Sequence, residues 1–369
     1  MRQRALQTVL LVHAIEQTDL SGDALSLEDR AHASGEAADG RALPTAADAS
    51  APLTGDSERF LARRADALLA RLRVRSPGID RVLAAAAGPS SLDRTLLLLG
   101  FALGFGIAFI DGGRIDIFAY PLIGLVLWNL IVYVILIVRA FELPGRARTA
   151  QTATVRDAAA ARRDGFLRRW LARLYAQRVR ARIETLITHS IGFNAPLAPG
   201  LRRFAADWWE VGRPLFRERA RRLLHMAALL AAVGLMLGYD LRGWMLRQVA
   251  GWGTTVFGPA SAHTALVTLY GAASAVSGVS IPSAHDIQAL AWTGATTGGG
   301  PAGPWLVLID WTALLYIVLP RLIAIIITTL SLWRHAITLR TPPSFAGYLT
   351  AVMRPLPSSP DPPPAESSG

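Results

Sequence analysis

The chain has 369 residues, of which 52% are hydrophobic and 18% are charged, and its formal net charge is +11. All 38 basic residues are arginine and none is lysine, and there is no cysteine, which excludes lysine-dependent phosphate loops, Schiff bases, disulfides and thiolate or cysteine–metal chemistry. A basic chain can bind nucleic acid, but these arginines flank long apolar segments. This pattern is typical of membrane topology, so we expect no nucleic-acid partner.

Residues 1–94 are predicted to form a helical cytoplasmic region. A short apolar run follows Met1-Arg2-Gln3-Arg4 and is interrupted by Gln7 and His13. Because no small-residue cleavage site follows it, we interpret the run as an amphipathic helix and not as a signal peptide.

Two further helices are predicted in this region. Ser26 and Asp29 have the spacing of a capping box, and residues 31–55 favour a loose connection. Ser57 is predicted to cap the next helix, which Pro77 ends. The apolar positions of that helix recur at helical spacing: Phe60, Leu61, Ala65, Leu68, Leu69 and Leu72.

Four apolar stretches predict an all-α, polytopic membrane protein with four transmembrane helices. They cover residues 95–110, 117–138, 223–239 and 305–333, and the first two form a hairpin over 95–138. Between and beyond them lie a basic cytoplasmic region at 139–222, an extracytoplasmic region at 240–304 with short helices, and a disordered, Pro-rich tail at 341–369. Eight tryptophans near the expected boundaries indicate an aromatic belt: Trp208, Trp209, Trp244, Trp252, Trp292, Trp305, Trp311 and Trp333.

The distribution of arginine predicts the orientation. Residues 1–94 and 139–222 contain 31 of the 38 arginines, whereas the turn at 111–116 and the region 240–304 share three. Because positively charged loops stay in the cytoplasm, both termini and the central region are expected to face the cytosol of a bacterium, with the chain in the inner membrane.

The central basic region contains a predicted amphipathic helix. Apolar residues from Phe166 to Ile187 recur every three or four positions, and arginines such as Arg173 and Arg180 occupy the other face. Such a helix suits the membrane surface or a groove of a partner, and anionic lipid head groups are candidate ligands of the basic face. A cytoplasmic helix packed on its own domain is the equally weighted alternative.

Arg321 is the main candidate for an intramembrane site. It lies near the middle of the last apolar segment, where an unpaired charge is costly. Pro320 precedes it and leaves a backbone acceptor open, while Asp310 is about 16 Å away along the helix, too far for a direct ion pair. Asn129 is expected at a matching depth. We therefore predict one polar contact between Arg321 and Asn129, with a packing role favoured over a conduction role.

Other signals are weaker. Gly100/Gly104 and Gly234/Gly238 form small-xxx-small pairs that would let helix backbones approach closely, within one chain or between copies. The histidines are scattered, and His263 with His285-Asp286 lacks the tight spacing of metal ligands. No catalytic or dinucleotide-binding motif is present. We therefore expect no catalytic residues, no metal and no cofactor.

Several short motifs resemble an uncharacterised bacterial membrane-protein family, the domain of unknown function numbered twenty-eight sixty-eight. The motif residues are Arg242, Gly243, Gly251, Trp252, Thr254, Thr255, Pro259 and Pro320, and the run from Leu25 to Ala31 fits the start of the family. The chain departs from the family at Gly253, where a glutamate is usual, so a functional carboxylate at that position is in doubt. The resemblance implies no established activity. It implies a possible cytosolic GTPase partner.

The sequence therefore predicts a non-enzymatic membrane anchor or regulator for a cytosolic partner such as a GTPase. The basis is the large arginine-rich cytoplasmic part of the chain. The alternative is a homo-oligomeric channel or small transporter subunit lined by Arg321 and Asn129.

Overall fold

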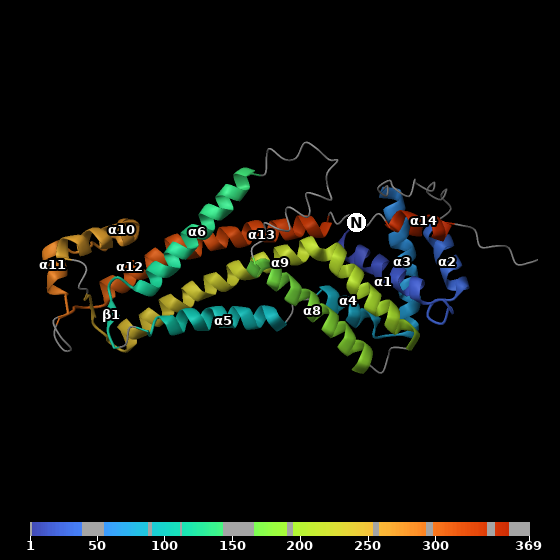
Figure 1. Ribbon diagram of the computed structural model, residues 1–369, viewed down its shortest axis with the longest axis horizontal. Coiled ribbons are helices and arrows are strands. Elements are labelled where there is room, and N and C mark those ends of the chain that lie inside the picture. The colour runs from blue at the N-terminus through green and yellow to red at the C-terminus, as the bar shows by residue number, and fades with distance from the viewer. Residues whose placement is uncertain are drawn as a thin grey trace, which may run out of the picture. The chain divides into compact units, whose positions relative to one another are not determined.

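The computed structural model describes residues 2–38, 55–87, 91–110, 113–142, 166–189, 195–253, 258–292, 298–337 and 344–353. The described chain is mostly helical, as predicted (Figure 1). It divides into two compact units. The first unit comprises Met1–Pro89, Arg169–Arg217 and Ser331–Gly369, and the second unit comprises Ser90–Arg168 and Glu218–Leu330.

The first unit is built from helices that lie before, within and after the central basic region of the sequence. Its elements are α1 (Gln3–Thr18), α2 (Leu27–Ala38), α3 (Gly55–Arg75), α4 (Ile79–Ala87), most of α8 (Phe166–His189), the short 3₁₀ turn at Ala195–Leu197, the beginning of α9 (Ala198–Asp240) and α14 (Ser344–Met353).

Helix α1 is buried on all sides, so the prediction of an amphipathic helix was wrong. Every residue from Leu6 to Ile15 is buried, including Gln7 and His13. The reason is that several elements cover it at once: α3 packs along it, α9 approaches it so closely that a Cβ on Gly200 would lie 2.9 Å from the Cα of Ile15, and α14 contacts His13. Helix α1 is thus the central core helix of the first unit.

The capping box and the apolar stripe of the next helices are confirmed. The backbone N–H of Asp29 donates to Oγ of Ser26 at 3.1 Å, and the N–H of Ser26 donates back to the Asp29 carboxylate at 3.1 Å. All six stripe residues of α3 are buried, from Phe60 to Leu72. Two boundaries were wrong: α2 continues to Ala38, and α3 begins at Gly55, which places Ser57 inside the helix.

The C-terminal segment differs from its prediction as well. Residues 344–353 form helix α14, whereas a disordered tail was expected from 341. Phe345 and Leu349 are buried in the first unit, each about 1% exposed, because they complete the apolar core around α1. Residues 354–369 lie outside the described part of the chain.

The second unit contains the predicted membrane segments except for residues 331–333. Its elements are α5 (Ser91–Ile107), β1 (Ile115–Asp116), α6 (Tyr120–Glu142), the rest of α9, a π-helical turn at Leu241–Met245, β2 (Ala250–Gly251), α10 (Pro259–Ser277), α11 (Ala284–Ala289), α12 (Gly303–Ala313), a second π-helical turn at Leu314–Val318 and most of α13 (Leu319–Ile337) (Figure 1).

Two helical runs are long and apolar enough to cross a membrane, Ala198–Met245 and Gly303–Arg334. They include the predicted third and fourth segments, but α9 begins well before residue 223 and joins the basic region to the apolar one. The predicted first and second segments lie on α5 and α6. The apolar part of α6 within the described residues is only Tyr120–Ile135, so four spans stay a prediction.

The two glycine pairs lie in the contact between α5 and α9 within one chain. On α5, Gly100 faces the backbone of Ala227 and Gly104 faces the backbone of Ala231, and on α9 Gly234 faces Phe101. In each case the missing side chain leaves room for the backbone of the other helix. Of the two possibilities left open by the sequence, the structure shows the packing within one chain.

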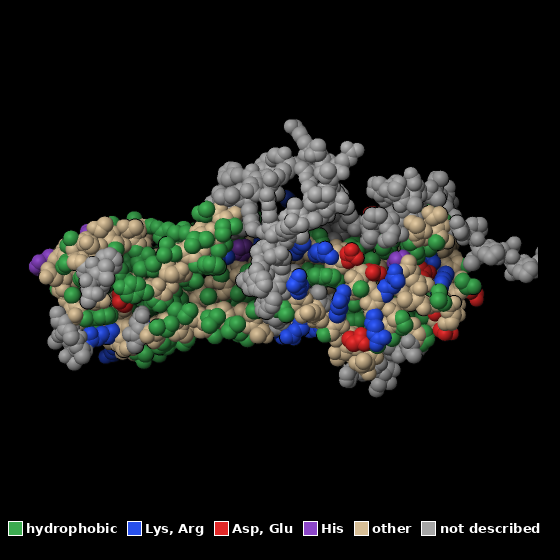
Figure 2. All heavy atoms as spheres, viewed as in Figure 1, with side chains coloured by type: hydrophobic (Ala, Val, Ile, Leu, Met, Phe, Trp, Pro, Cys, Tyr) green, Lys and Arg blue, Asp and Glu red, His purple; other side chains and the backbone are tan. Residues whose placement is uncertain are grey.

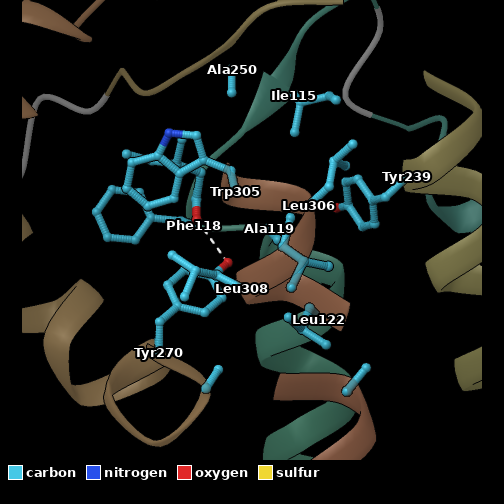
Figure 3. Packing of buried hydrophobic residues seen from close by; sticks show 14 of the residues in the cluster. Ile115, Phe118, Ala119, Leu122, Tyr239, Ala250, Tyr270, Trp305, Leu306 and Leu308 are labelled. Carbon is cyan, nitrogen blue, oxygen red and sulfur yellow. Dashed lines mark hydrogen bonds between the residues drawn. The ribbon is translucent and has the colours of Figure 1, made fainter. Parts of the chain in front are cut away.

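Residues 240–304 hold the core of one end of the second unit. β1 and β2 pair in parallel, with Ile115 opposite Ala250, the one small sheet among the described residues. Figure 3 shows Tyr270 of α10 reaching under this pair, where its hydroxyl donates to the backbone carbonyl of Ile117 at 2.8 Å. The sequence predicted short helices here. Strands of two residues are too short to produce an alternating pattern.

Only some of the tryptophans are exposed, as the predicted aromatic belt requires. Trp244 and Trp333 are exposed, at 61% and 65%. Trp208, Trp252 and Trp305 are buried and belong to the cores, so for these three the belt prediction was wrong. Two of the buried indole N–H groups have acceptors: Nε1 of Trp208 donates to the carbonyl of Ala86 at 3.2 Å, and Nε1 of Trp252 donates to the carbonyl of Ile287 at 2.7 Å.

Candidate functional site around Arg321

The backbone near Arg321 departs from regular α-helix. Pro320 has no N–H, so it cannot donate a helical hydrogen bond, and its ring crowds the carbonyl one turn earlier. A regular α-helix cannot accommodate both effects without a local distortion. The preceding residues form the π-helical turn Leu314–Val318, in which the N–H of Leu319 donates to the carbonyl of Leu314. Such turns are often found at functional positions in helices.

Arg321 is buried among neutral partners from two other helices. Its Nε donates to Oδ1 of Asn129 on α6 at 2.7 Å, the contact that the sequence predicted from matching depth. Its Nη1 lies 2.7 Å from Nδ1 of His225 on α9. The guanidinium also lies over the ring of Tyr133, 5.6 Å from its centroid. Arg321 and His225 are each 4% exposed and Asn129 is fully buried.

Asn129 is held in position by its own helix. Its Nδ2 donates to the carbonyl of Leu125 at 2.7 Å, which fixes the amide so that Oδ1 points to Arg321. The hydroxyl of Tyr133, one turn further along α6, donates to the same Oδ1 at 3.3 Å. The amide oxygen therefore accepts two hydrogen bonds and its orientation is determined by the network.

His225 was missed by the sequence reasoning. It lies close to the start of the third apolar segment, and a histidine inside an apolar stretch is the signal that would have identified it. Because the guanidinium has only donors, Nδ1 of His225 must act as an acceptor. The ring is then neutral and its proton is on Nε2.

Among the residues that the structure describes, no Asp or Glu forms an ion pair with Arg321. Asp310, the third candidate from the sequence, lies on α12 and is not part of this network. Its carboxyl group interacts electrostatically with Asp240, and its Oδ1 is buried without a hydrogen-bond partner among the described residues. The structure thus brings together Arg321 and Asn129 and leaves Asp310 apart.

The family-motif residues form a second, structural cluster. Arg242 is fully buried, and its guanidinium donates to the backbone carbonyls of Ala108 and Arg114 and, at 2.8 Å, to Oε1 of Gln248. It therefore ties the end of α9 to the segment that follows α5. A Cβ on Gly243 would meet the side chain of Leu306, so a small residue is needed there.

The remaining motif residues have simple packing roles where they are described. A Cβ on Gly251 would lie 2.7 Å from the carbonyl of Leu290, and Trp252 is buried in the core. Pro259 occupies the first turn of α10, where no N–H is required. Thr254 and Thr255 lie outside the described residues.

A third polar cluster lies in the core of the first unit. Nη2 of Arg64 on α3 lies 2.6 Å from Oε1 of Glu16 on α1, and both side chains are almost fully buried. The hydroxyl of Tyr348 on α14 accepts from Nη1 of Arg64 at 2.8 Å and donates to Glu16. The ring of His13 packs against the rings of Phe345 and Tyr348, with centroid distances of 4.7 and 4.5 Å.

Acid is expected to destabilise the first unit through His13. The pKa of His13 is lowered from 6.5 to about 4, chiefly by burial and also by the positive charge of Arg203, while Glu16 acts in the opposite direction. Because the unfolded chain binds the proton more tightly, stability is lost as the pH falls from about 6.5 towards about 4. The decrease is expected to be smaller in His13→Gln when thermal unfolding is followed against pH; an unchanged profile would contradict the assignment.

The described residues contain no group of three or more side chains suited to hold a metal ion. His285 is exposed next to Asp286, with Nδ1 and Oδ1 3.9 Å apart. Comparison of the chain with protein-family models, curated proteins and solved structures finds no match. The resemblance to the family named above therefore rests on its short motifs alone.

Proposed function

We propose that the chain is a four-span protein of the bacterial inner membrane and that it acts as a non-enzymatic anchor or regulator for a cytosolic partner such as a GTPase. In this proposal α5, α6, the later part of α9, and α12–α13 cross the bilayer. Both termini and the region 139–222 face the cytosol.

The proposal that the chain crosses the membrane rests on the distribution of exposed apolar side chains. Large hydrophobic residues are exposed along one helix after another of the second unit: Leu98, Leu99, Leu103 and Ile107 on α5, Leu127, Trp128, Leu130, Ile131, Val134 and Ile135 on α6, Leu237 on α9, and Leu319, Leu322, Ile323, Ile326, Ile327 and Leu330 on α13. Figure 2 shows hydrophobic side chains over α5, α6, α12 and α13. A water-exposed surface of this composition would be costly, whereas lipid covers it at no cost.

The first unit has a different surface. Arginines and carboxylates alternate over its visible face in Figure 2. On α8, Arg173, Arg178 and Arg180 are exposed, while Ile183 of the same helix is buried and Glu184 pairs with Arg202 of α9 at 2.7 Å. The described part of α8 therefore packs on its own unit and presents arginines outward. This supports an acidic protein partner or anionic lipid as the ligand of that face.

Co-purification tests the partner. Full-length protein extracted in mild detergent is expected to retain a cytosolic protein, and the triple variant Arg173→Glu, Arg178→Glu, Arg180→Glu should lose it. If each arginine contributes about 1 kcal/mol near an acidic surface, the loss is on the order of 100-fold in affinity. The matched control changes the same three positions to lysine and should keep the partner. Retention of the partner by the glutamate variant, or no stable partner for the folded wild type, would contradict the proposal.

One observation favours a second function, a homo-oligomeric channel or small transporter subunit. Arg321 is a buried cation without a carboxylate partner among the described residues, in the middle of a predicted span. A group of this kind is typical of sites that contact a permeating or transported species. Flux through liposomes distinguishes the two functions, because an anchor is silent in that assay.

A further inference from the structure

We propose that Arg321 and His225, together with Asn129 and Tyr133, form a binding site for a single small inorganic anion of the size of a halide. The proposal rests on the membrane-embedded arrangement proposed above. It goes beyond that arrangement by naming the ligand of the buried network.

The buried positive charge of Arg321 has only neutral groups as its described neighbours. The guanidinium of Arg321 is 4% exposed, and its described neighbours are an amide, a neutral imidazole and a phenol. None of these carries a negative charge. A cation that is removed from water needs a counter-ion, because hydrogen bonds to neutral groups recover only part of its hydration energy. A mobile anion supplies that charge where the described chain does not.

The geometry of the donors is the second argument. A guanidinium has five N–H groups, of which Nε–H is directed to Asn129 and one on Nη1 to His225, and the Tyr133 side chain is a further hydrogen-bond partner. With its Nδ1 accepting from Arg321, His225 carries its proton on Nε2 and is a donor as well. The network therefore offers more donors than acceptors. That excess suits a ligand that only accepts hydrogen bonds.

The position of the site limits the size of the ligand. The helical run Gly303–Arg334 places Arg321 18 residues after one end and 13 before the other. At about 1.5 Å per residue, the Cα of Arg321 lies roughly 20 Å or more from either end of the run, and the run is longer than the hydrocarbon layer is thick. In the proposed arrangement Arg321 lies near the middle of its span, about 15 Å from the lipid head groups at either surface of a layer about 30 Å thick. A small dehydrated anion fits the site better than a phosphate group of a lipid.

The test compares chloride with gluconate, a large anion that the site should reject. Purified full-length protein is unfolded thermally at constant ionic strength while chloride replaces gluconate. A saturable rise in the midpoint temperature is expected for the wild type. In Asn129→Asp a carboxylate is placed 2.7 Å from Nε of Arg321, so the variant should be at least as stable as the wild type in gluconate and should no longer respond to chloride.

Two further variants test the contribution of His225 and control for the loss of an arginine elsewhere in the unit. His225→Gln retains the charge of Arg321 and is expected to weaken the apparent chloride affinity about tenfold, the equivalent of one hydrogen bond to a charged group. Arg247→Gln removes an exposed arginine of the same unit and should leave the response unchanged. No saturable chloride effect in the wild type, or an equal effect in Asn129→Asp, would overturn the proposal. Extraction of the membranes with carbonate tests the membrane embedding separately, because an integral protein is retained whether or not it binds an anion.

Discussion

Gly104→Ala is expected to unfold well below the wild type, with a loss of about 3 kcal/mol or more, because the added methyl group has no space. A Cβ at this position would overlap the backbone carbonyl of Ala231 on α9. Backbone atoms of two packed helices cannot rotate away as a side chain can, so α5 and α9 have to separate along their whole contact. Thermal unfolding of the detergent-solubilised protein measures the effect.

Gly106→Ala is the matched control for this prediction. Gly106 lies on the same helix, two residues further, and a Cβ there would meet nothing within 4 Å. Because alanine is about 1 kcal/mol better than glycine inside a helix, this variant should be neutral or slightly more stable. Equal destabilisation by the two substitutions would show that helix propensity, and not the contact with α9, determines the result.

Arg242→Met is expected to lower the free energy of unfolding by about 3–5 kcal/mol, because it removes the charged group from a buried hydrogen-bond network. The guanidinium donates to the carbonyls of Ala108 and Arg114, and methionine leaves the buried acceptor of Ala108 and the partly buried acceptor of Arg114 without this donor. Arg242→Lys should restore only a small part of the stability, because one ammonium group cannot replace a planar group that binds the two carbonyls and Gln248 at once.

Arg247→Met provides the comparison for Arg242. Arg247 is exposed and lies five residues further along the same segment. Its backbone has a left-handed φ of 51°, which costs about the same for arginine and methionine, so the substitution should change the unfolding temperature by little. A similar loss for both arginines, measured by unfolding in the same detergent, would argue that Arg242 does not act through its backbone contacts.

The polar contact at the centre of the second unit was predicted from depth alone. Arg321 and Asn129 lie in the middle of two apolar segments, and groups at equal depth in a bundle can meet; the structure places them 2.7 Å apart. His225 is the third member and was not predicted, since it lies near the predicted boundary of its segment. Only the true extent of α9, which begins at Ala198, places His225 well inside a helix.

The contacts between distant residues in the first unit could not be predicted from the sequence for a similar reason. Glu16 and Arg64 are 48 residues apart, and Tyr348 joins them from near the other end of the chain. Each of these residues is of an ordinary type in an ordinary helical pattern. Their pairing depends on which helices pack together, and hydrophobic periodicity indicates which face of a helix is buried but not which partner covers it.

The sequence by itself determined the properties that are local or additive along the chain: the helical content, the capping box at Ser26, the buried stripe of α3, and the apolar character of the second unit. Tertiary structure decided that α1 is enclosed on all sides and that α14 completes its core. It also decided that both glycine pairs lie in the contact between α5 and α9, and that Arg242 ties the end of α9 to the segment after α5. The physical reason is that local patterns depend on neighbours within a few residues. The partners of buried groups depend on contacts between distant segments, which form only when the whole unit has folded.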